Sequence, residues 1–151
     1  MIETTELLIH QVIIFPYDML GEQIEELKGK IMGQRVVDVE PLTMETTVSA
    51  SGTIRGTQVT KMLTFVGSPT TSEGVLHGKG VGMIIAGAEV VTFTAEGVGR
   101  LSSSGSAGWR GSYFYRTSSN GKLSFLNNMI GIFEGEFDSQ GNFSHKSWEW
   151  K

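Results

Sequence analysis

The chain contains no cysteine and only three prolines among its 151 residues. The absence of cysteine excludes disulfide bonds, thiolate nucleophiles, zinc–thiolate sites and iron–sulfur clusters. Charge of either sign is sparse: 12 basic and 16 acidic residues give a formal net charge of −4, and the basic residues are scattered. Because no basic stripe is present, the sequence predicts no nucleic-acid partner.

Long hydrophobic runs are also missing. The most apolar stretch, residues 6–15, is interrupted by His10 and Gln11 and is followed by Pro16, so it is unsuited to span a bilayer. The first residues lack the basic region and the small-residue cleavage site of a secretory signal. We therefore expect a soluble, cytoplasmic protein without a membrane partner. The length suits one domain, residues 1–151, and no linker divides it.

Glycine is abundant, with 20 residues, and it marks turns between runs of Val, Ile, Thr, Phe and Tyr. The turn signals are Arg55-Gly56, Ala86-Gly87-Ala88, Asn120-Gly121 and Gln140-Gly141, of which Asn-Gly is the strongest hairpin signal. Strands are predicted at 44–55, 58–66, 75–86, 89–101, 108–118, 122–137 and 142–150, with two more near 6–15 and 31–39. Closure removes exposed strand edges. The sequence thus predicts an all-β, antiparallel up-and-down barrel of about eight strands.

One segment departs from this pattern. Between Asp18 and Lys28, the residues Leu20, Ile24 and Leu27 recur at helical spacing, Asp18 is a suitable cap and Gly29 follows. The spacing predicts a short N-terminal helical segment.

The run H-G-K-G-V-G-M-I-I-A, residues 77–86, resembles a phosphate-binding loop only superficially. The third glycine of a dinucleotide fingerprint is replaced by Met83 or Ile85, depending on the frame, and no Gly-Lys is followed by Ser or Thr. Gly78, Gly80 and Gly82 instead share one face of a strand. This bare strip favours a structural role, in strand coiling or in packing under a neighbouring aromatic ring; close approach of a ligand is the alternative.

Alternation along the later strands assigns aromatic side chains to the barrel interior. Asn127 lies among them in this assignment, and a buried amide requires several hydrogen bonds. Those bonds go either to the protein itself or to a ligand. The candidate ligand-binding residues are Phe93, Trp109, Tyr113, Tyr115, Phe125, Asn127 and Phe133.

The opposite faces carry charged and apolar residues. Charged side chains at Glu96, Arg100, Arg110, Arg116 and Glu134 are expected to form surface ion pairs, or, if the faces are inverted, to line a polar cavity. Leu126, Ile130 and Ile132 are assigned outward, which predicts a homo-oligomer. His10, His77 and His145 show no metal-ligand spacing, and His145 is placed on a solvated strand face. We predict no metal or cofactor, and no catalytic residue is identified.

Several segments carry a resemblance: G-T-I-R-G, G-V-G-R-L, W-R-G-S-Y-F-Y-R-T-S-S-N-G-K-L-S-F-L-N-N and W-E-W-K. Over residues 30–151 they resemble a family of small uncharacterised prokaryotic proteins. More remotely, the predicted meander is similar to allene oxide cyclase-like and lipocalin-like (calycin) barrels. That likeness implies an aromatic interior that binds apolar, fatty-acid-derived or polyketide-like molecules.

Three functions are consistent with these observations. The first is binding of a small apolar molecule inside the barrel. The second is an isomerase or cyclase that uses the same pocket, with Asn127 or a Tyr hydroxyl polarising the substrate. The third is a packed barrel with a structural or oligomerisation role.

Overall fold

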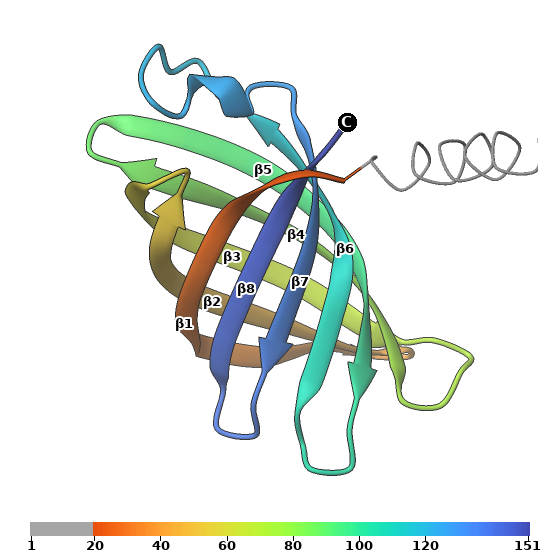
Figure 1. Ribbon diagram of the computed structural model, residues 1–151. Helices are drawn as coiled ribbons and strands as arrows, with labels where there is room; N and C mark the ends of the chain where they lie inside the picture. Colours follow the sequence, from red (N-terminus) through yellow and green to blue (C-terminus); the bar gives the residue numbers. More distant parts are fainter. Residues whose placement is uncertain (1–19) are drawn as a thin grey trace, which may run out of the picture.

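Each strand pairs antiparallel with the next along the chain, and the last strand returns to the first, so the sheet closes into a barrel (Figure 1). The computed structural model describes residues 20–151, and the strand predicted near 6–15 lies outside them. Within the described residues, the predicted eight-stranded all-β barrel is confirmed. Its strands are β1 (Leu20–Val39), β2 (Leu42–Ile54), β3 (Thr57–Pro69), β4 (Val75–Ala86), β5 (Glu89–Leu101), β6 (Ala107–Arg116), β7 (Ile130–Phe137) and β8 (Asn142–Trp150).

Most predicted turns join adjacent strands. Arg55 and Gly56 both have positive φ and connect β2 to β3, while Gly87 and Gly141 have positive φ in the β4–β5 and β7–β8 turns. Glycine suits these positions because it has no Cβ to clash in the left-handed region. The described residues contain no helix long and apolar enough to cross a membrane.

The prediction of a hairpin at Asn120-Gly121, followed by one strand over 122–137, is only partly correct. Strand β7 begins only at Ile130, and the preceding residues form a long connection that contains the 3₁₀ helix η1 (Ser124–Leu126). Leu123 and Leu126 are three residues apart and both are fully buried, which suits a 3₁₀ turn, where side chains three apart lie on one side. The connection lies across one end of the barrel (Figure 1), which we call the plugged end.

The predicted N-terminal helix is also wrong over residues 20–28, which belong to β1; Asp18 and Met19 lie outside the described residues. The register of β1 against β8 shifts between Gln23 and Glu25, where two steps on β1 match one on β8. This bulge buries Ile24 and Glu25 in succession. A bulge breaks the two-residue period of a strand, so Leu20, Ile24 and Leu27 mimic helical spacing.

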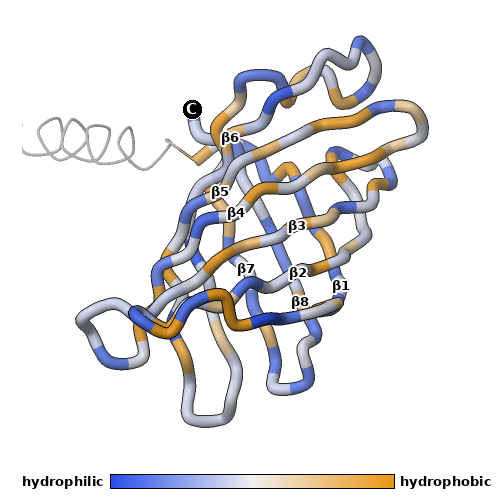
Figure 2. Tube along the Cα trace, turned by 180° about the vertical axis from the view of Figure 1, so that it is seen from behind, coloured by the Kyte–Doolittle hydropathy of each residue, from blue (hydrophilic) through white to orange (hydrophobic). Residues whose placement is uncertain are grey.

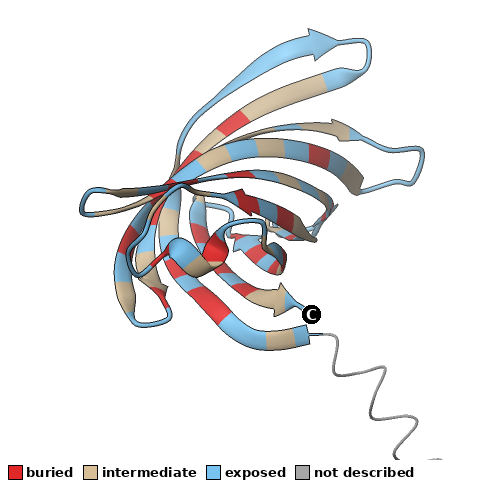
Figure 3. Cartoon of the chain, turned by 90° about the horizontal axis from the view of Figure 1, so that it is seen from above, coloured by how far each residue is buried: buried red, intermediate tan, exposed pale blue. Residues whose placement is uncertain are grey.

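Hydrophobic and hydrophilic residues alternate along the strands, and buried residues alternate with exposed ones in the same way (Figures 2 and 3). On β6, Trp109, Tyr113 and Tyr115 are buried, whereas Arg110 and Arg116 are exposed. The predicted inward face of this strand is therefore confirmed, as are those of residues 91–99 and 131–137.

The glycine strip of β4 faces the interior and receives aromatic rings. A Cβ at Gly78 would lie 2.8 Å from Cζ3 of Trp109, and one at Gly99 of β5 would lie 2.6 Å from Cε2 of the same ring. The ring of Phe93 lies against Gly82 in the same manner. Large rings from β5 and β6 thus pack against these glycines, as the structural interpretation of the run predicts, and Gly78 and Gly80 also line an interior cavity.

Candidate functional site

A cluster of polar side chains lies buried inside the barrel, where a small barrel would ordinarily hold apolar residues. Glu25 of β1, Lys61 of β3 and His145 of β8 are each at most 2% exposed. The Lys61 ammonium donates a hydrogen bond to Glu25 Oε2 at 2.8 Å. Nδ1 of His145 lies 3.2 Å from the same oxygen, although the contact lacks the alignment of a hydrogen bond. Because buried charges need partners, the three residues act as one unit.

Two tyrosines of β6 extend this cluster. The Tyr115 hydroxyl donates to Glu25 Oε1 at 2.7 Å and lies 3.4 Å from Ser147 Oγ. The Tyr113 hydroxyl and His145 Nε2 are 2.8 Å apart and share one hydrogen bond. The Lys61 ammonium also lies over two rings, 4.0 Å from the centroid of Tyr113 and 4.6 Å from that of Phe93. Every charged group of the cluster thus has polar or aromatic neighbours.

The electrostatics of the cluster favour one arrangement of charge. Burial alone raises the pKa of Glu25, but attraction to Lys61 and His145 outweighs burial and holds that pKa well below its usual range. Burial lowers the pKa of Lys61, and Glu25 opposes this shift. Burial and the Lys61 charge lower the pKa of His145, so the imidazole is neutral at pH 7. A carboxylate, an ammonium and a neutral imidazole leave the cluster without net charge.

The tyrosine hydroxyls keep their protons. Burial, reinforced by the Glu25 carboxylate, raises the pKa of Tyr113 and of Tyr115 well above the ordinary tyrosine value. Both groups are therefore hydrogen-bond donors at physiological pH. When Tyr113 donates to Nε2, the proton of the neutral imidazole is on Nδ1 and faces Glu25.

A small cavity adjoins the cluster on the side away from the plugged end. The space that the centre of a water molecule can reach is about 40 Å³. Its walls are aromatic rings and bare glycine backbone, and its polar side chains include Tyr113 and His145. The rings are Phe65, Trp109, Phe133, Phe137 and Phe143. A cavity that is apolar on its walls and has a few convergent polar groups has the character of a small-molecule site.

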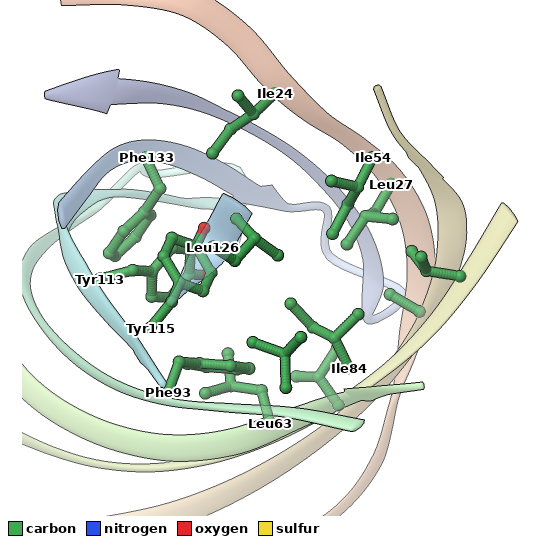
Figure 4. Packing of buried hydrophobic residues seen from close by; sticks show 14 of the residues in the cluster. Ile24, Leu27, Ile54, Leu63, Ile84, Phe93, Tyr113, Tyr115, Leu126 and Phe133 are labelled. Atoms are coloured by element: carbon green, nitrogen blue, oxygen red, sulfur yellow. The ribbon is translucent and has the colours of Figure 1, made fainter. Parts of the chain in front are cut away.

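The plugged end seals the other side of the cluster. The Ser119 hydroxyl and the Leu123 amide both donate to Glu89 Oε1, which ties the β6–β7 connection to the start of β5. Figure 4 shows Leu126 directed into the barrel beside Tyr115. Access to Tyr113 and His145 is therefore from the end that carries the loop at 102–106 and the turn at 138–141.

Five of the seven predicted site residues meet inside the barrel: Phe93, Trp109, Tyr113, Tyr115 and Phe133 are all buried. Figure 4 shows four of them converging from β5, β6 and β7. Phe125 and Asn127 do not join them. Phe125 lies in η1 under the guanidinium of Arg55, 4.1 Å from its ring centroid. Asn127 is exposed and accepts a hydrogen bond from the Thr117 amide, so its amide is satisfied by the connection itself.

Sequence reasoning missed the charged half of the site. The placement of His145 on a solvated face is wrong, because His145 is buried beside Glu25. Phe143, His145 and Ser147 alternate along β8, and the apolar first member was a signal that this face points inward. The β1 bulge breaks the alternation of buried and exposed residues, so the sequence pattern did not indicate that Glu25 is buried. Lys61 alternates with Val59 and Leu63 on β3, a pattern that could have placed it inside.

The prediction that these side chains point out of the barrel is correct for the charged residues and wrong for Leu126. Arg110 pairs with Glu134 on the outer surface at 3.9 Å, and Glu96 accepts a hydrogen bond from exposed His77 at 2.8 Å. These residues therefore do not line the cavity through their side chains. The outward assignment of Leu126 is wrong: its side chain is fully buried, because it belongs to η1 and not to a strand. Ile130 remains exposed.

The fold and site define a closed eight-stranded antiparallel barrel whose interior contains a neutral cluster of ionisable groups beside a small aromatic cavity. No family model, no curated protein and no solved structure matches the chain. The likeness to small prokaryotic barrels and to calycin or allene oxide cyclase-like barrels is thus supported only as far as the barrel itself.

Proposed function

We propose that the barrel binds a small, largely apolar molecule in the cavity beside Tyr113 and His145. The observation that supports this function is the composition of the cavity: aromatic rings and glycine backbone form its walls, and two hydrogen-bonding side chains lie on one side. Apolar walls favour a ring or short chain, whereas the hydroxyl of Tyr113 and the imidazole fix its orientation.

The size of the cavity limits this ligand. A reachable volume of 40 Å³ accommodates about three water molecules, or about 90 Å³ of liquid water, if each needs roughly 10–15 Å³ of such space. That space is smaller than the roughly 150 Å³ apolar cavity that takes up benzene, so even one small ring enters only when side chains that line the cavity move aside. A fatty-acid chain, such as the calycin likeness implies, requires displacement of rings at the unplugged end, where Phe65 is only partly buried. We therefore favour compact ligands over long ones.

Titration of the protein with toluene tests this proposal, with chemical shifts of the aromatic side chains and thermal unfolding as the two measurements. We expect saturable shifts at Trp109 and Phe133 and a higher melting temperature, because a ligand that binds only the native state stabilises it. Absence of saturable binding by toluene and by phenol contradicts the proposal.

A cavity-filling variant locates the binding. Ala95→Leu adds apolar volume to the cavity wall at the position directly across the sheet from Tyr113. Val98→Leu on the exposed face of the same strand is the matched control. We expect toluene binding to disappear in Ala95→Leu and to persist in Val98→Leu. Equal binding by both variants would place the ligand elsewhere.

The second candidate is an isomerase or cyclase acting in the same cavity. It is favoured by Tyr113 and His145, a hydrogen-bonded acid–base pair, and not by Asn127, which lies outside the barrel interior. Such groups can polarise a carbonyl oxygen while the aromatic walls orient the substrate. The third candidate, a packed barrel that acts through its outer surface, remains if no small molecule binds. Self-association likewise remains a prediction.

A further inference from the structure

We infer that Tyr113 and His145 form a proton relay that binds weakly acidic hydroxyl compounds, phenols or enols, as their anions. This inference rests on the proposed function, because it names the ligand class of the same cavity. It depends on two contacts: Tyr113 Oη to His145 Nε2 at 2.8 Å, and His145 Nδ1 to Glu25 Oε2 at 3.2 Å. Tyr113 and His145 both line the cavity, whereas Glu25 lies behind them.

The charges of the cluster select the ligand. Lys61 and Glu25 compensate each other, and the imidazole between Glu25 and Tyr113 is neutral, so a ligand that brings a permanent charge leaves that charge unpaired in a buried site. A carboxylate at neutral pH has no proton to release and is disfavoured. A cation is disfavoured for the same reason. A phenol or enol enters neutral and carries its own proton, so it can ionise only if the protein accepts that proton.

Tyr113 and His145 together provide the acceptor for the ligand proton. As the ligand O–H proton moves to Tyr113 Oη, the tyrosine proton moves to His145 Nε2. The products are a ligand oxyanion, a neutral tyrosine and an imidazolium whose Nδ1–H faces the Glu25 carboxylate. No bond between heavy atoms forms or breaks, and the total charge of site and ligand stays zero. The unaligned contact between Nδ1 and Glu25 becomes an ion pair in this state.

The groups around His145 act on its proton in both directions. The ionisable groups that face the ring from other strands are Glu25 of β1, Lys61 of β3 and Tyr113 of β6, and Tyr115 of β6 bonds Glu25 and not the ring. Strand β7 contributes only Phe133 and Gly135, which lie against the ring without charge. Glu25 is the one anion facing the imidazole within the described part of the chain. Burial and the Lys61 charge oppose protonation of the ring more strongly than Glu25 favours it, so the relay needs the ligand oxyanion as a second negative charge beside the imidazolium.

The probe 4-nitrophenol tests this inference, because its phenolate and phenol absorb at different wavelengths. At a pH below the pKa of the free probe, we expect the bound probe to show the phenolate band. Its apparent pKa should fall by at least about one unit, a tenfold shift in ionisation. In Tyr113→Phe the band should disappear while toluene still binds. Tyr115→Phe is the matched control, since Tyr115 is equally buried but bonds Glu25 instead of His145, and it should keep the band.

The outcomes separate the two proposals. If 4-nitrophenol binds but stays neutral, or if Tyr113→Phe retains the phenolate band, the relay is wrong and ligand binding stands. If neither 4-nitrophenol nor toluene binds, the proposed function fails, and the relay has no ligand. His145→Gln offers a second check and should also bind the probe as neutral phenol. If that variant does not fold, Tyr113→Phe alone decides.

Discussion

The Lys61 ammonium lies 2.8 Å from Glu25 Oε2 inside the barrel, and the two residues belong to strands separated by β2. The contact therefore joins two strands that are not hydrogen-bonded to each other and passes over the inner face of β2. Replacing Lys61 with methionine should leave the Glu25 carboxylate buried without its cation. We expect the free energy of unfolding to fall by about 3–5 kcal/mol, measured by urea denaturation.

A double variant serves as control for this prediction. In Glu25→Gln combined with Lys61→Met, both charges are absent, and the amide can still accept the Tyr115 hydrogen bond. We expect this protein to be more stable than the Lys61→Met single variant, because no unpaired charge remains buried. If Lys61→Met is as stable as the wild type, the interior is open to water and the ion pair is not desolvated.

Stability should fall in mild acid because of His145. Its pKa is lowered in the folded state from about 6.5, so below that pH the unfolded chain binds a proton that the folded protein does not. The free energy of unfolding then decreases as pH falls, by up to about 1.4 kcal/mol per pH unit. Glu25 adds to the loss at lower pH, since its pKa is depressed from 4.5 and the unfolded chain is protonated first.

Urea denaturation between pH 7 and pH 5 measures this dependence. His145→Gln should flatten the profile over that range. His77→Gln removes a histidine from the outer face, where the ring is half-exposed beside Glu96, and should retain the wild-type slope. A wild-type protein as stable at pH 5 as at pH 7 would show that His145 protonates without cost, contrary to its burial.

Much of the barrel could be predicted because alternation and turn chemistry are local properties. Gly87 and Gly141 mark their hairpins by the same positive φ that the structure shows. The errors occurred where a local rule was broken by a contact elsewhere. The β1 bulge sets Ile24 and Glu25 side by side in the interior, and the resulting spacing imitates a helix. The Asn120-Gly121 signal was overridden because Leu123 and Leu126 bury themselves at the plugged end.

The site was half predicted for a related reason. Aromatic residues at alternate positions of one strand indicate which face of that strand is buried. The sequence of β6 alone was therefore sufficient to place Trp109, Tyr113 and Tyr115 in the barrel interior. The ion pair could not, because a buried charge is recognisable only with its partner, and Lys61 is 36 residues from Glu25 in the chain. Sequence gives a lone lysine or glutamate on a strand no reason to be inside. The register of four adjacent strands, β8, β1, β2 and β3, brings Glu25, Lys61 and His145 together.

The glycine strip should be intolerant of even a methyl group. In Gly78→Ala the new Cβ lies 2.8 Å from the Trp109 ring, so the indole must move away from the barrel wall. We expect a loss of about 1–3 kcal/mol in the free energy of unfolding, together with a changed Trp109 environment in near-ultraviolet circular dichroism. Gly108→Ala, whose Cβ meets no atom within 4 Å, should be neutral or slightly stabilising. Equal losses in both variants would point to backbone conformation and not to ring packing.

Self-association is best tested away from Leu126. A row of aligned outer positions runs across five strands, from Thr64 through Val81, Thr94 and Phe114 to Ile130, and it carries no charge. Phe114, next to the centre of this row, is its largest side chain and is 40% exposed. An uncharged patch can meet a second copy of itself about a two-fold axis without like-charge repulsion.

If the chain forms a dimer through this row, Phe114→Asp should halve the mass measured by light scattering. Leu126→Asp should instead unfold the protein, since it places a charge in the core. A Phe114→Asp protein that keeps the oligomeric mass of the wild type would exclude this row as the interface.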